Sequence, residues 1–365
     1  MAATSRPWWQ RLLGLLGSLL ATHGAKAVDL PEDRGEALYH VYTGGGVTAH
    51  GPALLVRKSM ADRVSLSAGY YVDAVSNASI DVVTTASKFS ETRQAFDLGV
   101  DYVVRDSTIS LSTYQSKEPD YKARSVSLDV TQEVFGNMTT VALGFTRGSD
   151  DVGQKGVGFF DTARHWQYRF GLTQILSPTW LASANLEVVS DDGYLGNPYR
   201  AARVFGATVP ERHPRTRSSR AIKLRSLKEI GERQSLRGEY RYFWDNWAIK
   251  AHTLEAGYAR YFGDKWLAEG FGRYYKQSKA NFYSDNAQSE TTYVSRNRQL
   301  GTFDSIGLGA KLTYSAGRYK GEYDIKVNGA LEAYRFNYKD FTDVRDGSKY
   351  SFIGSLFQVY VTATY

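Results

Sequence analysis

The densest group of chemically active side chains in the sequence lies between residues 191 and 225. It begins with the turn formers Asp191, Asp192 and Gly193 and continues with basic residues around His213. The arginines of interest are Arg200, Arg203, Arg212, Arg215, Arg217 and Arg220. A guanidinium group can bind phosphate or carboxylate through two parallel hydrogen bonds. The segment therefore predicts a loop that attracts anions.

Two other roles remain open for this arginine segment. Its side chains can contact the phosphates of lipopolysaccharide from a surface loop, or they can pair with Asp and Glu inside the protein. Both roles use the same guanidinium chemistry, so residue type alone does not separate them.

Acidic and basic side chains also recur through the second half of the chain, in or beside predicted strands. Their members are Glu239, Arg241, Glu255, Glu269, Arg273, Asp324, Lys326 and Glu332, with Asp245, Arg237, Lys250 and Arg335 beside them. Opposite charges on one face of a sheet can form a ladder across neighbouring strands. We expect this ladder either to fill a narrow interior or to line a channel and tune its selectivity.

Histidine chemistry offers an enzymatic alternative. His252 lies near Glu255 in the sequence, and Ser235 or Ser278 can approach it in a folded chain. The sequence contains no G-x-S-x-G nucleophile elbow, however. A barrel-embedded hydrolase therefore stays an alternative, and we assign no catalytic residue.

Asp191 and Asp192, with neighbouring carbonyl groups, suggest calcium ligation. Their spacing matches no EF-hand loop. We therefore assign no metal ligand and no cofactor.

The elements that position these groups are predicted to be β-strands. Apolar residues recur at every second position in stretches such as 96–104, 126–130, 306–314 and 323–333. Polar or small residues fill the positions between them, so each strand has one apolar and one polar face.

Strand length and loop rhythm favour a membrane barrel among the all-β folds. Several strands run to about ten residues or more, which is long for a soluble protein. Short turns alternate with longer connections, at 76–94, 148–162, 191–216, 280–303 and 338–350. We predict a transmembrane antiparallel β-barrel of about 16 strands (range about 14–18), with short periplasmic turns and long extracellular loops. A periplasmic sandwich is the alternative.

The N-terminus predicts export. Basic residues precede an apolar run at Leu12–Ala21, and Ala25, Lys26 and Ala27 form a small-residue cleavage site. The predicted organisation is a signal peptide at 1–27, a short periplasmic segment at 28–36 and the barrel at 37–365. Cleavage would remove three basic residues and no acid, and so lower the net charge from +7 to +4. For an exported protein, nucleic acid is not an expected partner.

The C-terminus is typical of an outer-membrane protein. In the terminal sequence FQVYVTATY, Phe357, Val359, Val361 and Tyr365 share one face. This arrangement resembles the signal by which barrel-insertion machinery recognises its clients, and that machinery is an expected partner.

Composition is compatible with the same fold. The chain has no cysteine and no apolar run of about 18 residues, so neither a disulfide scaffold nor a transmembrane helix is expected. Aromatic residues near strand ends, including Tyr70, Tyr71, Tyr274 and Tyr275, are expected to form two girdles at the membrane interfaces. In the connection after Tyr71, we expect Asp73, Asp81 or Glu91 to meet Arg93 or the arginine segment.

Several segments resemble one known family. They are YYVDAVSNASIDVVTTASKFSETR (70–93), DDGYLGNPYR (191–200), ERHPRTRSSRAI (211–222), YRYFWDNWAIKAHTLE (240–255) and GRYYKQSKANFY (272–283). These blocks are similar to an uncharacterised group of outer-membrane barrels, domain of unknown function 3570, over most of 37–365. The resemblance implies the fold and the location, and it transfers no catalytic or binding residue. The resemblance also implies that the gene is encoded near genes for small lipoproteins, thioredoxin-like proteins and a flavin-attaching transferase.

These patterns predict an outer-membrane channel or export conduit for a small or medium solute, with a weak anion preference. The alternative is a structural component of an envelope redox or cofactor-handling assembly, with a periplasmic lipoprotein or redox proteins as partners. In each case outer-membrane lipid and lipopolysaccharide are expected to surround the barrel.

Overall fold

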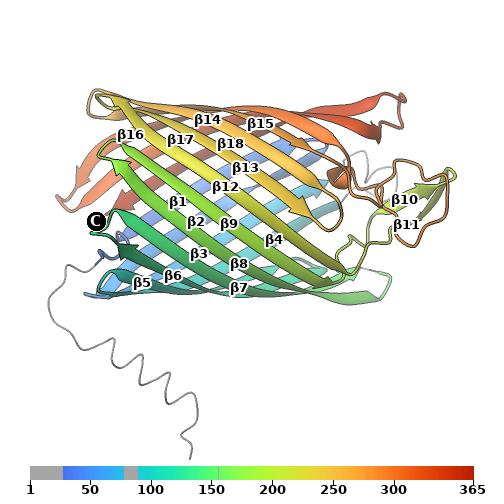
Figure 1. Cartoon of the computed structure of the whole chain (residues 1–365), viewed down its shortest axis with the longest axis horizontal. Helices are drawn as coiled ribbons and strands as arrows, with labels where there is room; N and C mark the ends of the chain where they lie inside the picture. The colour runs from blue at the N-terminus through green and yellow to red at the C-terminus, as the bar shows by residue number, and fades with distance from the viewer. Residues whose placement is uncertain (1–27, 78–88, 155) are drawn as a thin grey trace, which may run out of the picture.

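The computed structural model describes residues 28–77, 89–154 and 156–365. Sixteen antiparallel strands close into one barrel, and a two-stranded hairpin, β10–β11, projects beyond one end of it (Figure 1). The predicted fold class and strand number are therefore confirmed. The predicted signal peptide (1–27) and Asp81 lie outside the described residues.

The strand bounds follow the alternating segments of the sequence. The first nine strands are β1 (Arg34–Gly44), β2 (Val47–Ala61), β3 (Val64–Asn77), β4 (Phe89–Val104), β5 (Ser107–Lys117), β6 (Tyr121–Val134), β7 (Thr139–Gln154), β8 (Phe159–Ser177) and β9 (Trp180–Gly193). The hairpin outside the barrel is β10 (Ala201–Val204) and β11 (Ala207–Pro210). The remaining strands are β12 (Thr216–Gly231), β13 (Gln234–Asp245), β14 (Lys250–Phe262), β15 (Trp266–Gln277), β16 (Phe303–Tyr319), β17 (Tyr323–Thr342) and β18 (Lys349–Thr364), with one 3₁₀ turn, η1 (Arg298–Leu300).

Each barrel strand pairs with its neighbours in the ring, and β1 pairs with β18 to close it. That seam runs in register from Arg34 opposite Thr364 to Gly44 opposite Gly354. Closure matters because hydrocarbon offers no partner to an unpaired backbone N–H or C=O group. β1 begins at Arg34, earlier than the boundary at 37 set from the sequence.

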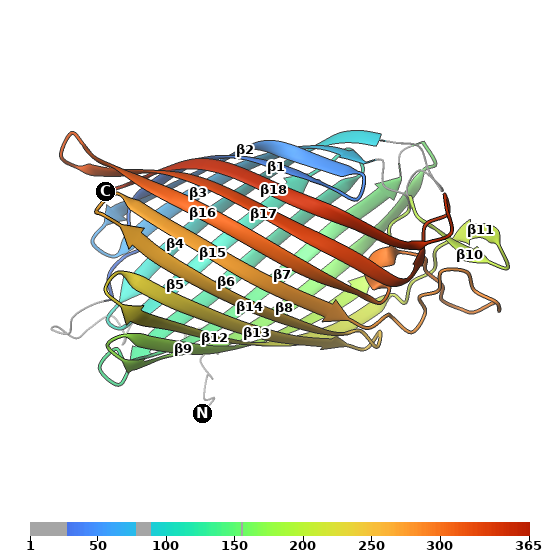
Figure 2. The same ribbon diagram turned by 90° about the horizontal axis from the view of Figure 1, so that it is seen from above.

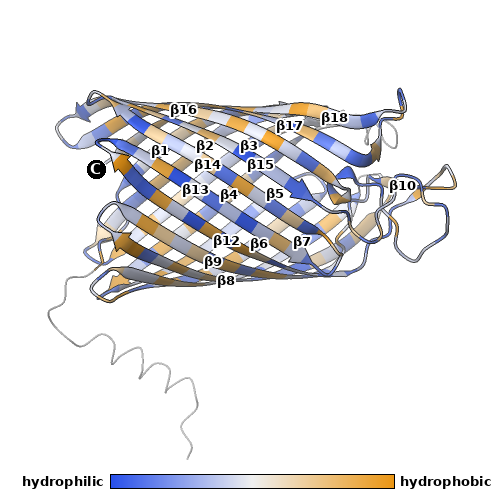
Figure 3. Ribbon diagram, turned by 45° about the horizontal axis from the view of Figure 1, so that its top comes forward, coloured by the Kyte–Doolittle hydropathy of each residue, from blue (hydrophilic) through white to orange (hydrophobic). Residues whose placement is uncertain are grey.

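The strands place their apolar side chains outward and their polar side chains in the lumen. On β16, Leu308 is 67% exposed on the outer surface, whereas Thr313 is buried and donates to Asn328 of β17 in the lumen. Orange and blue residues alternate along the strands in Figure 3. The outward exposure of the apolar face is the inverse of a soluble core and suits contact with lipid.

Consecutive aromatic residues divide between the two faces. Tyr70 and Tyr274 are exposed on the outer surface, as expected for a girdle. The prediction was wrong for Tyr71 and Tyr275, which face the lumen: Tyr71 bonds to His40 and Tyr275 to Gln277. Alternation in a strand sends neighbours to opposite faces, so an adjacent pair cannot share one girdle.

The two ends of the barrel differ. Short turns such as those at 62–63, 105–106 and 232–233 share one end with the C-terminus, and the longer connections gather at the other end (Figure 2). By the usual arrangement of outer-membrane barrels, the first end is periplasmic and the second extracellular. No helix in the described residues is long and apolar enough to cross a membrane.

We call the structure at the extracellular end the mouth cap. It comprises the connections 194–215, 246–249 and 278–302, and residues 338–350, which include the adjoining ends of β17 and β18. Three buried apolar clusters hold it together. The first contains Trp247, Ile249, Ala280, Phe282, Tyr283 and Leu300; the second Tyr338, Phe341 and Tyr350; the third Ala202, Ala287 and Val294. The cap is therefore a compact structure with its own cores.

Candidate functional site

The lumen-facing side of β12–β16 is rich in cations, and we call it the basic wall. Its lumenal cations are Arg217, Lys223, Arg225, Arg237, Arg241, Arg273 and Lys311. The carboxylates that share this face of the same strands are Glu229, Glu239, Asp245, Glu255 and Glu269. Cations thus outnumber carboxylates along the wall.

Glu239 shows how incompletely the cations are neutralised. Its carboxylate lies 2.5 Å from the Lys223 ammonium and 3.3 Å from the Arg225 guanidinium. Arg237 approaches the same carboxylate at 3.7 Å and makes its shorter contact, 2.6 Å, with Glu255. One carboxylate therefore serves three cations, which leaves a positive field in this part of the lumen.

Arg217 is fixed at the top of the wall by Asp245. Its Nε and Nη2 donate to one carboxylate oxygen of Asp245 at 2.9 and 2.7 Å. The other oxygen accepts from the backbone N–H groups of Trp247 and Ile249, at 3.0 and 2.8 Å. The guanidinium also lies 4.6 Å from the centre of the Trp247 ring. The Asp245 carboxylate thus both stabilises a turn of the mouth cap and orients Arg217.

Beneath the cap the wall lines a cavity of about 360 Å³, which we call the mouth cavity. Arg217, Arg241, Phe243, Tyr275 and Gln277 line it from the strands, and His213 with Asn297, Gln299 and Leu300 from the cap. The two guanidinium groups flank Phe243, at 5.8 and 5.5 Å from its ring centre. Cationic and aromatic faces can bind an anion that carries an apolar or planar part.

Two arginines near this cavity have weak or no carboxylate partners. Arg241 reaches Glu187 only at 3.9 Å. In the part of the chain that the structure describes, Arg273 has no carboxylate at ion-pair distance, and it lies over the ring of Tyr334 at 5.9 Å. Arg241 and Arg273 are therefore among the least neutralised cations of the wall.

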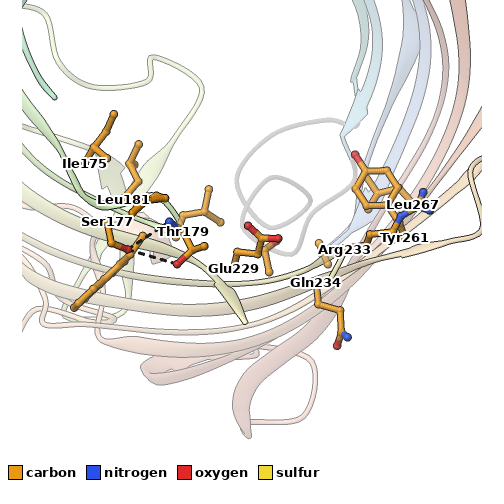
Figure 4. A pocket seen from close by; sticks show the side chains of 14 residues that line it. Ile175, Ser177, Thr179, Leu181, Glu229, Arg233, Gln234, Tyr261 and Leu267 are labelled. Atoms are coloured by element: carbon orange, nitrogen blue, oxygen red, sulfur yellow. Dashed lines mark hydrogen bonds between the residues drawn. The ribbon is translucent and has the colours of Figure 1, made fainter. Parts of the chain in front are cut away.

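Two further cavities continue along the same wall toward the periplasm. One of about 510 Å³ is lined by Arg225, Arg237, Lys311 and Glu332 among others. Another, of about 410 Å³, lies at the periplasmic turns around Glu229 and Arg233 (Figure 4). These two share Leu227, Ser235, Ala259, Tyr261 and Leu267, so they are contiguous.

The wall on the opposite side of the barrel, formed by β2–β6, carries more carboxylates than cations; we call it the acidic wall. In the ring order β4 lies diametrically across from β14. The lumenal carboxylates of β2–β6 are Asp73, Glu91, Asp97, Asp101, Asp129 and Glu133, and the lumenal cations of these strands are Arg57 and Arg93. A solute in the lumen would therefore meet a transverse field, positive toward the basic wall.

The arginine segment does not converge on one site. Arg200 directly precedes β10 in the cap, Arg203 lies within β10, and Arg212 donates to the carbonyl of Thr291 at 2.8 Å. Arg215 forms two hydrogen bonds with Asp161, at 2.7 and 2.9 Å.

Only one of the six predicted mouth arginines, Arg217, lines the mouth cavity. Arg220 faces outward on β12, opposite Trp244. Arg217 and Arg220 are three positions apart on one strand, and residues an odd number of positions apart lie on opposite faces. The sequence alone could therefore have separated them.

The predicted charge ladder is placed in the lumen. Glu239, Arg241, Glu255, Glu269, Arg273 and Glu332 share the lumenal face, and Lys311 pairs with Glu269 at 2.9 Å. Asp324 and Lys326 occupy the same face near the periplasmic exit, where Asp324 contacts Arg318 at 3.2 Å. Lys223 and Arg225, which belong to the basic segment, and Lys311, which the sequence did not single out, also line the wall. The prediction was wrong for Lys250 and Arg335, which face outward on β14 and β17.

The groups considered for catalysis and calcium binding are separated by the wall. His252 faces outward and bonds to the Tyr240 hydroxyl at 2.7 Å, whereas Ser235 faces the lumen. Ser278 donates to backbone carbonyls at the rim. Asp191 binds His165 and Asp192 binds Arg164, on opposite faces of β9, so the two carboxylates do not converge.

The predicted contact between Asp73 and Arg93 is present. The Arg93 guanidinium donates to Asp73 at 2.8 Å, and the other oxygen of Asp73 contacts the buried His40 at 2.7 Å. This cluster lies on the acidic wall, away from the arginine segment.

Glu211 joins the parts of the mouth cap. Its carboxylate accepts from the Ser295 hydroxyl at 2.9 Å and the Arg296 N–H at 2.8 Å, and it lies 3.2 Å from Nε2 of His213. Burial by itself raises the pKa of Glu211, but the partner His213 and the hydrogen bonds outweigh burial and hold that pKa below its usual range. The cap above the mouth cavity is thus fastened by an ionised carboxylate.

The C-terminal strand, β18, turns alternate apolar residues outward. Phe357, Val359 and Val361 are exposed on the outer face of β18, and Tyr365 packs against Tyr323 with ring centres 5.5 Å apart.

Glu91, Glu118 and Asp120 form a group of carboxylates near the extracellular end of the acidic wall.

Solved structures share the fold. A bacterial polysaccharide outer membrane secretin aligns at a TM-score of 0.50 with 8% identity, over 91% of this chain and 99% of that one. OmpT of Vibrio cholerae aligns at 0.48 with 8% identity, over 93% of this chain and 100% of that one. The siderophore receptor PirA of Pseudomonas aeruginosa aligns at 0.46 with 9% identity over 86% of this chain, which spans 60% of that receptor. At 8% identity, the likeness to the secretin shows the barrel fold alone.

Sequence comparison identifies the family. None of the curated proteins compared with the chain matches it. The profile of the family described as "Protein of unknown function (DUF3570)" matches residues 85–158 and 154–365, which include the basic wall, the mouth cap and most of the acidic wall. The chain belongs to this family of unknown function, as its sequence blocks and its barrel both indicate.

Proposed function

We propose that the protein is a conduit through the outer membrane for a small or medium solute, with a weak preference for anions. The observation that carries the proposal is the basic wall. Its cations exceed the carboxylates on the same strands, one carboxylate is shared by Lys223, Arg225 and Arg237, and cavities follow the wall along the lumen.

The fold supports the location that this function requires. The wall turns its apolar side chains outward, and the solved structures that resemble it are outer-membrane proteins. The β10–β11 hairpin of the mouth cap extends beyond the barrel end (Figure 1).

We expect the preference for anions to be weak because carboxylates neutralise part of the positive charge of the basic wall. Arg217 is held by Asp245 and Lys311 by Glu269, and the acidic wall faces them across the ring. Arg241 and Arg273 are the least compensated cations, so they carry most of the selectivity in this proposal.

Planar-bilayer recording across a salt gradient tests the proposal. The native barrel should conduct with a reversal potential that favours the anion, and Arg241→Gln with Arg273→Gln should move that potential toward the cation. The matched control is Lys117→Gln with Lys122→Gln, which removes the same charge from outward-facing positions of β5 and β6. A folded barrel that does not conduct, or an unchanged reversal potential in the lumenal variant, would overturn the proposal.

A further inference from the structure

The outer surface at the extracellular end of β12–β17 carries a second set of cations, unrelated to the lumen. We propose that these residues bind the phosphate groups of lipid A, the phosphorylated glycolipid anchor of lipopolysaccharide. We call the set the outer basic rim; its members are Arg220, Lys250, Lys276, Arg335 and Lys339. The inference rests on the proposed outer-membrane location but does not depend on conduction.

Cross-strand register makes the outer basic rim continuous. Arg220 lies opposite Trp244, which lies opposite Lys250 on the next strand. His252 lies opposite Lys276, and Lys276 lies opposite Asp304.

Two cations of β17 complete the rim. The Lys339 ammonium reaches the Asp304 carboxylate of β16 at 2.6 Å. Arg335 lies between Ile306 and Ile353 on the adjacent strands. The rim therefore crosses six neighbouring strands, β12–β17, without a break in the sheet.

The outer basic rim has little charge compensation from the protein. Lys339 is paired with Asp304. Among the described residues no carboxylate lies at ion-pair distance from Arg220, Lys250, Lys276 or Arg335. Lys276 shares the nearby Asp304 carboxylate with Lys339, and Arg220, Lys250 and Arg335 need counter-charge from outside the chain.

The surroundings place these cations at the level of lipid head groups. Ile306 and Ile353, which flank Arg335, are 57% and 64% exposed on the outer face. Outward-facing Tyr240, Trp244 and Tyr274 lie at the same end, as aromatic residues do at a membrane interface. Near that interface a cation is tolerated, but it is stabilised only if it meets an anion.

Lipid A fits this surface better than other lipids because its phosphates are clustered and multiply charged. Several cations spaced over neighbouring strands can bind two phosphate groups at once, each through charge-assisted hydrogen bonds. A lipid with a single phosphodiester meets one or two of the cations.

The structure supplies a matched control. Arg124 and Arg164 also face outward at the extracellular end, on β6 and β8. Each has a carboxylate partner: Asp151 at 3.6 Å from Arg124, and Asp192 at 2.8 Å from Arg164. Replacing these two removes outward charge without touching the rim.

The experiment measures lipid binding to the full-length barrel refolded free of lipopolysaccharide, by native mass spectrometry in detergent. The probes are lipid A, the same lipid A after removal of its phosphates, and phosphatidylglycerol. We expect lipid A to bind most tightly, and Lys250→Gln, Lys276→Gln and Arg335→Gln together to weaken it roughly tenfold, equivalent to about 1.4 kcal/mol. Arg124→Gln with Arg164→Gln should leave binding within about twofold of native, a change of under 0.5 kcal/mol.

Three results would overturn the inference: equal binding of dephosphorylated lipid A, equal binding of phosphatidylglycerol, or native affinity in the triple variant. Heat-dependent mobility on a gel shows whether each variant is folded, and bilayer conductance shows whether the lumen is unchanged. A triple variant that conducts normally but releases lipid A would separate the rim from the conduit.

Discussion

The mouth cap and the barrel wall use the same apolar side chains in opposite ways. Every buried aromatic residue in the described chain lies in the cap: Trp247, Phe282, Tyr283, Tyr338, Phe341 and Tyr350. In the wall the large apolar residues point outward, as Leu308 and Phe357 do. The cap is built like a small soluble domain, and the wall is built inside out.

The difference shows which force stabilises each region. Burial of apolar surface away from water holds the cap together. Backbone hydrogen bonds closed around the ring hold the wall, and lipid, not protein, covers its apolar face. The same substitution should therefore have unlike effects in the two regions.

Phenylalanine truncation should separate the regions most strongly. Phe341 is fully buried and packs against Tyr350 and the Arg296 guanidinium, whereas Phe357 is 48% exposed on the outer face. Phe341→Ala should destabilise the cap by about 3–5 kcal/mol, the cost of a buried aromatic side chain. Hydrogen exchange of the Asp343 and Gly347 amides, which bond within the cap, reports the loss.

Phe357→Ala should cost much less, since lipid fills the space that the ring leaves. Equal losses at Phe341 and Phe357 would mean that the cap is not a separate apolar core.

The next largest difference in stability is expected between a lysine placed on the outer face of the barrel wall and one placed on its lumenal face. Leu308→Lys puts an ammonium into the lipid-facing surface and should cost about 2–4 kcal/mol. Ala259→Lys faces the lumen opposite Glu269 and should cost little, while shifting selectivity toward anions. Equilibrium unfolding in lipid vesicles measures both, and a tolerant Leu308 position would contradict the assignment of the outer face.

Loss of the ionised carboxylate of Glu211 should loosen the cap and spare the wall. Glu211→Gln should cost about 1–3 kcal/mol, because the partners of a buried charged acceptor lose a strong hydrogen bond. The native pKa of Glu211 is lowered, so its stabilisation is complete above the unfolded value near 4.3 and is lost as the pH falls through the lowered pKa.

The groups that face Glu211 are His213, the Ser295 hydroxyl and the Arg296 N–H. Hydrogen exchange in the cap at pH 7 and at acid pH should therefore show an acid-dependent opening in the native protein. That opening should be absent in Glu211→Gln, and its persistence there would assign the acid sensitivity to another group.

The smallest effect is expected where the cap meets the wall through exposed charges. Arg215 and Asp161 are hydrogen-bonded at the surface, between the cap and β8. Arg215→Gln should cost less than about 1 kcal/mol, and the cost should shrink further as salt is added. A larger, salt-independent loss would show that this pair is part of the cap core.

Period-two alternation was enough to predict the wall. It separated Leu308 from Lys311 on β16 and Leu331 from Glu332 on β17, because a pleated strand between lipid and water admits only one pattern. The same alternation also predicts that residues an odd number of positions apart lie on opposite faces of a strand. That rule was not applied to the adjacent aromatic pairs or to Arg217 and Arg220, which were wrongly assigned to one face.

The mouth cap could not be predicted in the same way. Glu211 and Ser295 meet across long connections with no repeating pattern, and Asp245 contacts the 246–249 turn and Arg217 of β12 at once. Their proximity depends on packing of the cap cores, which leaves no periodic trace in the sequence. The transverse field is likewise a property of the closed ring, because β4 and β14 become opposite walls only when the ring shuts.

The seam between β1 and β18 has a consequence for the timing of assembly. Glu36 and Thr362, which are 326 positions apart, bond across it, so the sheet is sealed by residues from strands far apart in the sequence. Contacts of such separation form slowly, since a long chain segment has to be ordered first. Until β18 arrives, β1 presents an open edge that can pair with another chain. Assembly of this barrel thus depends on keeping the β1 edge from pairing with other chains until β18 arrives.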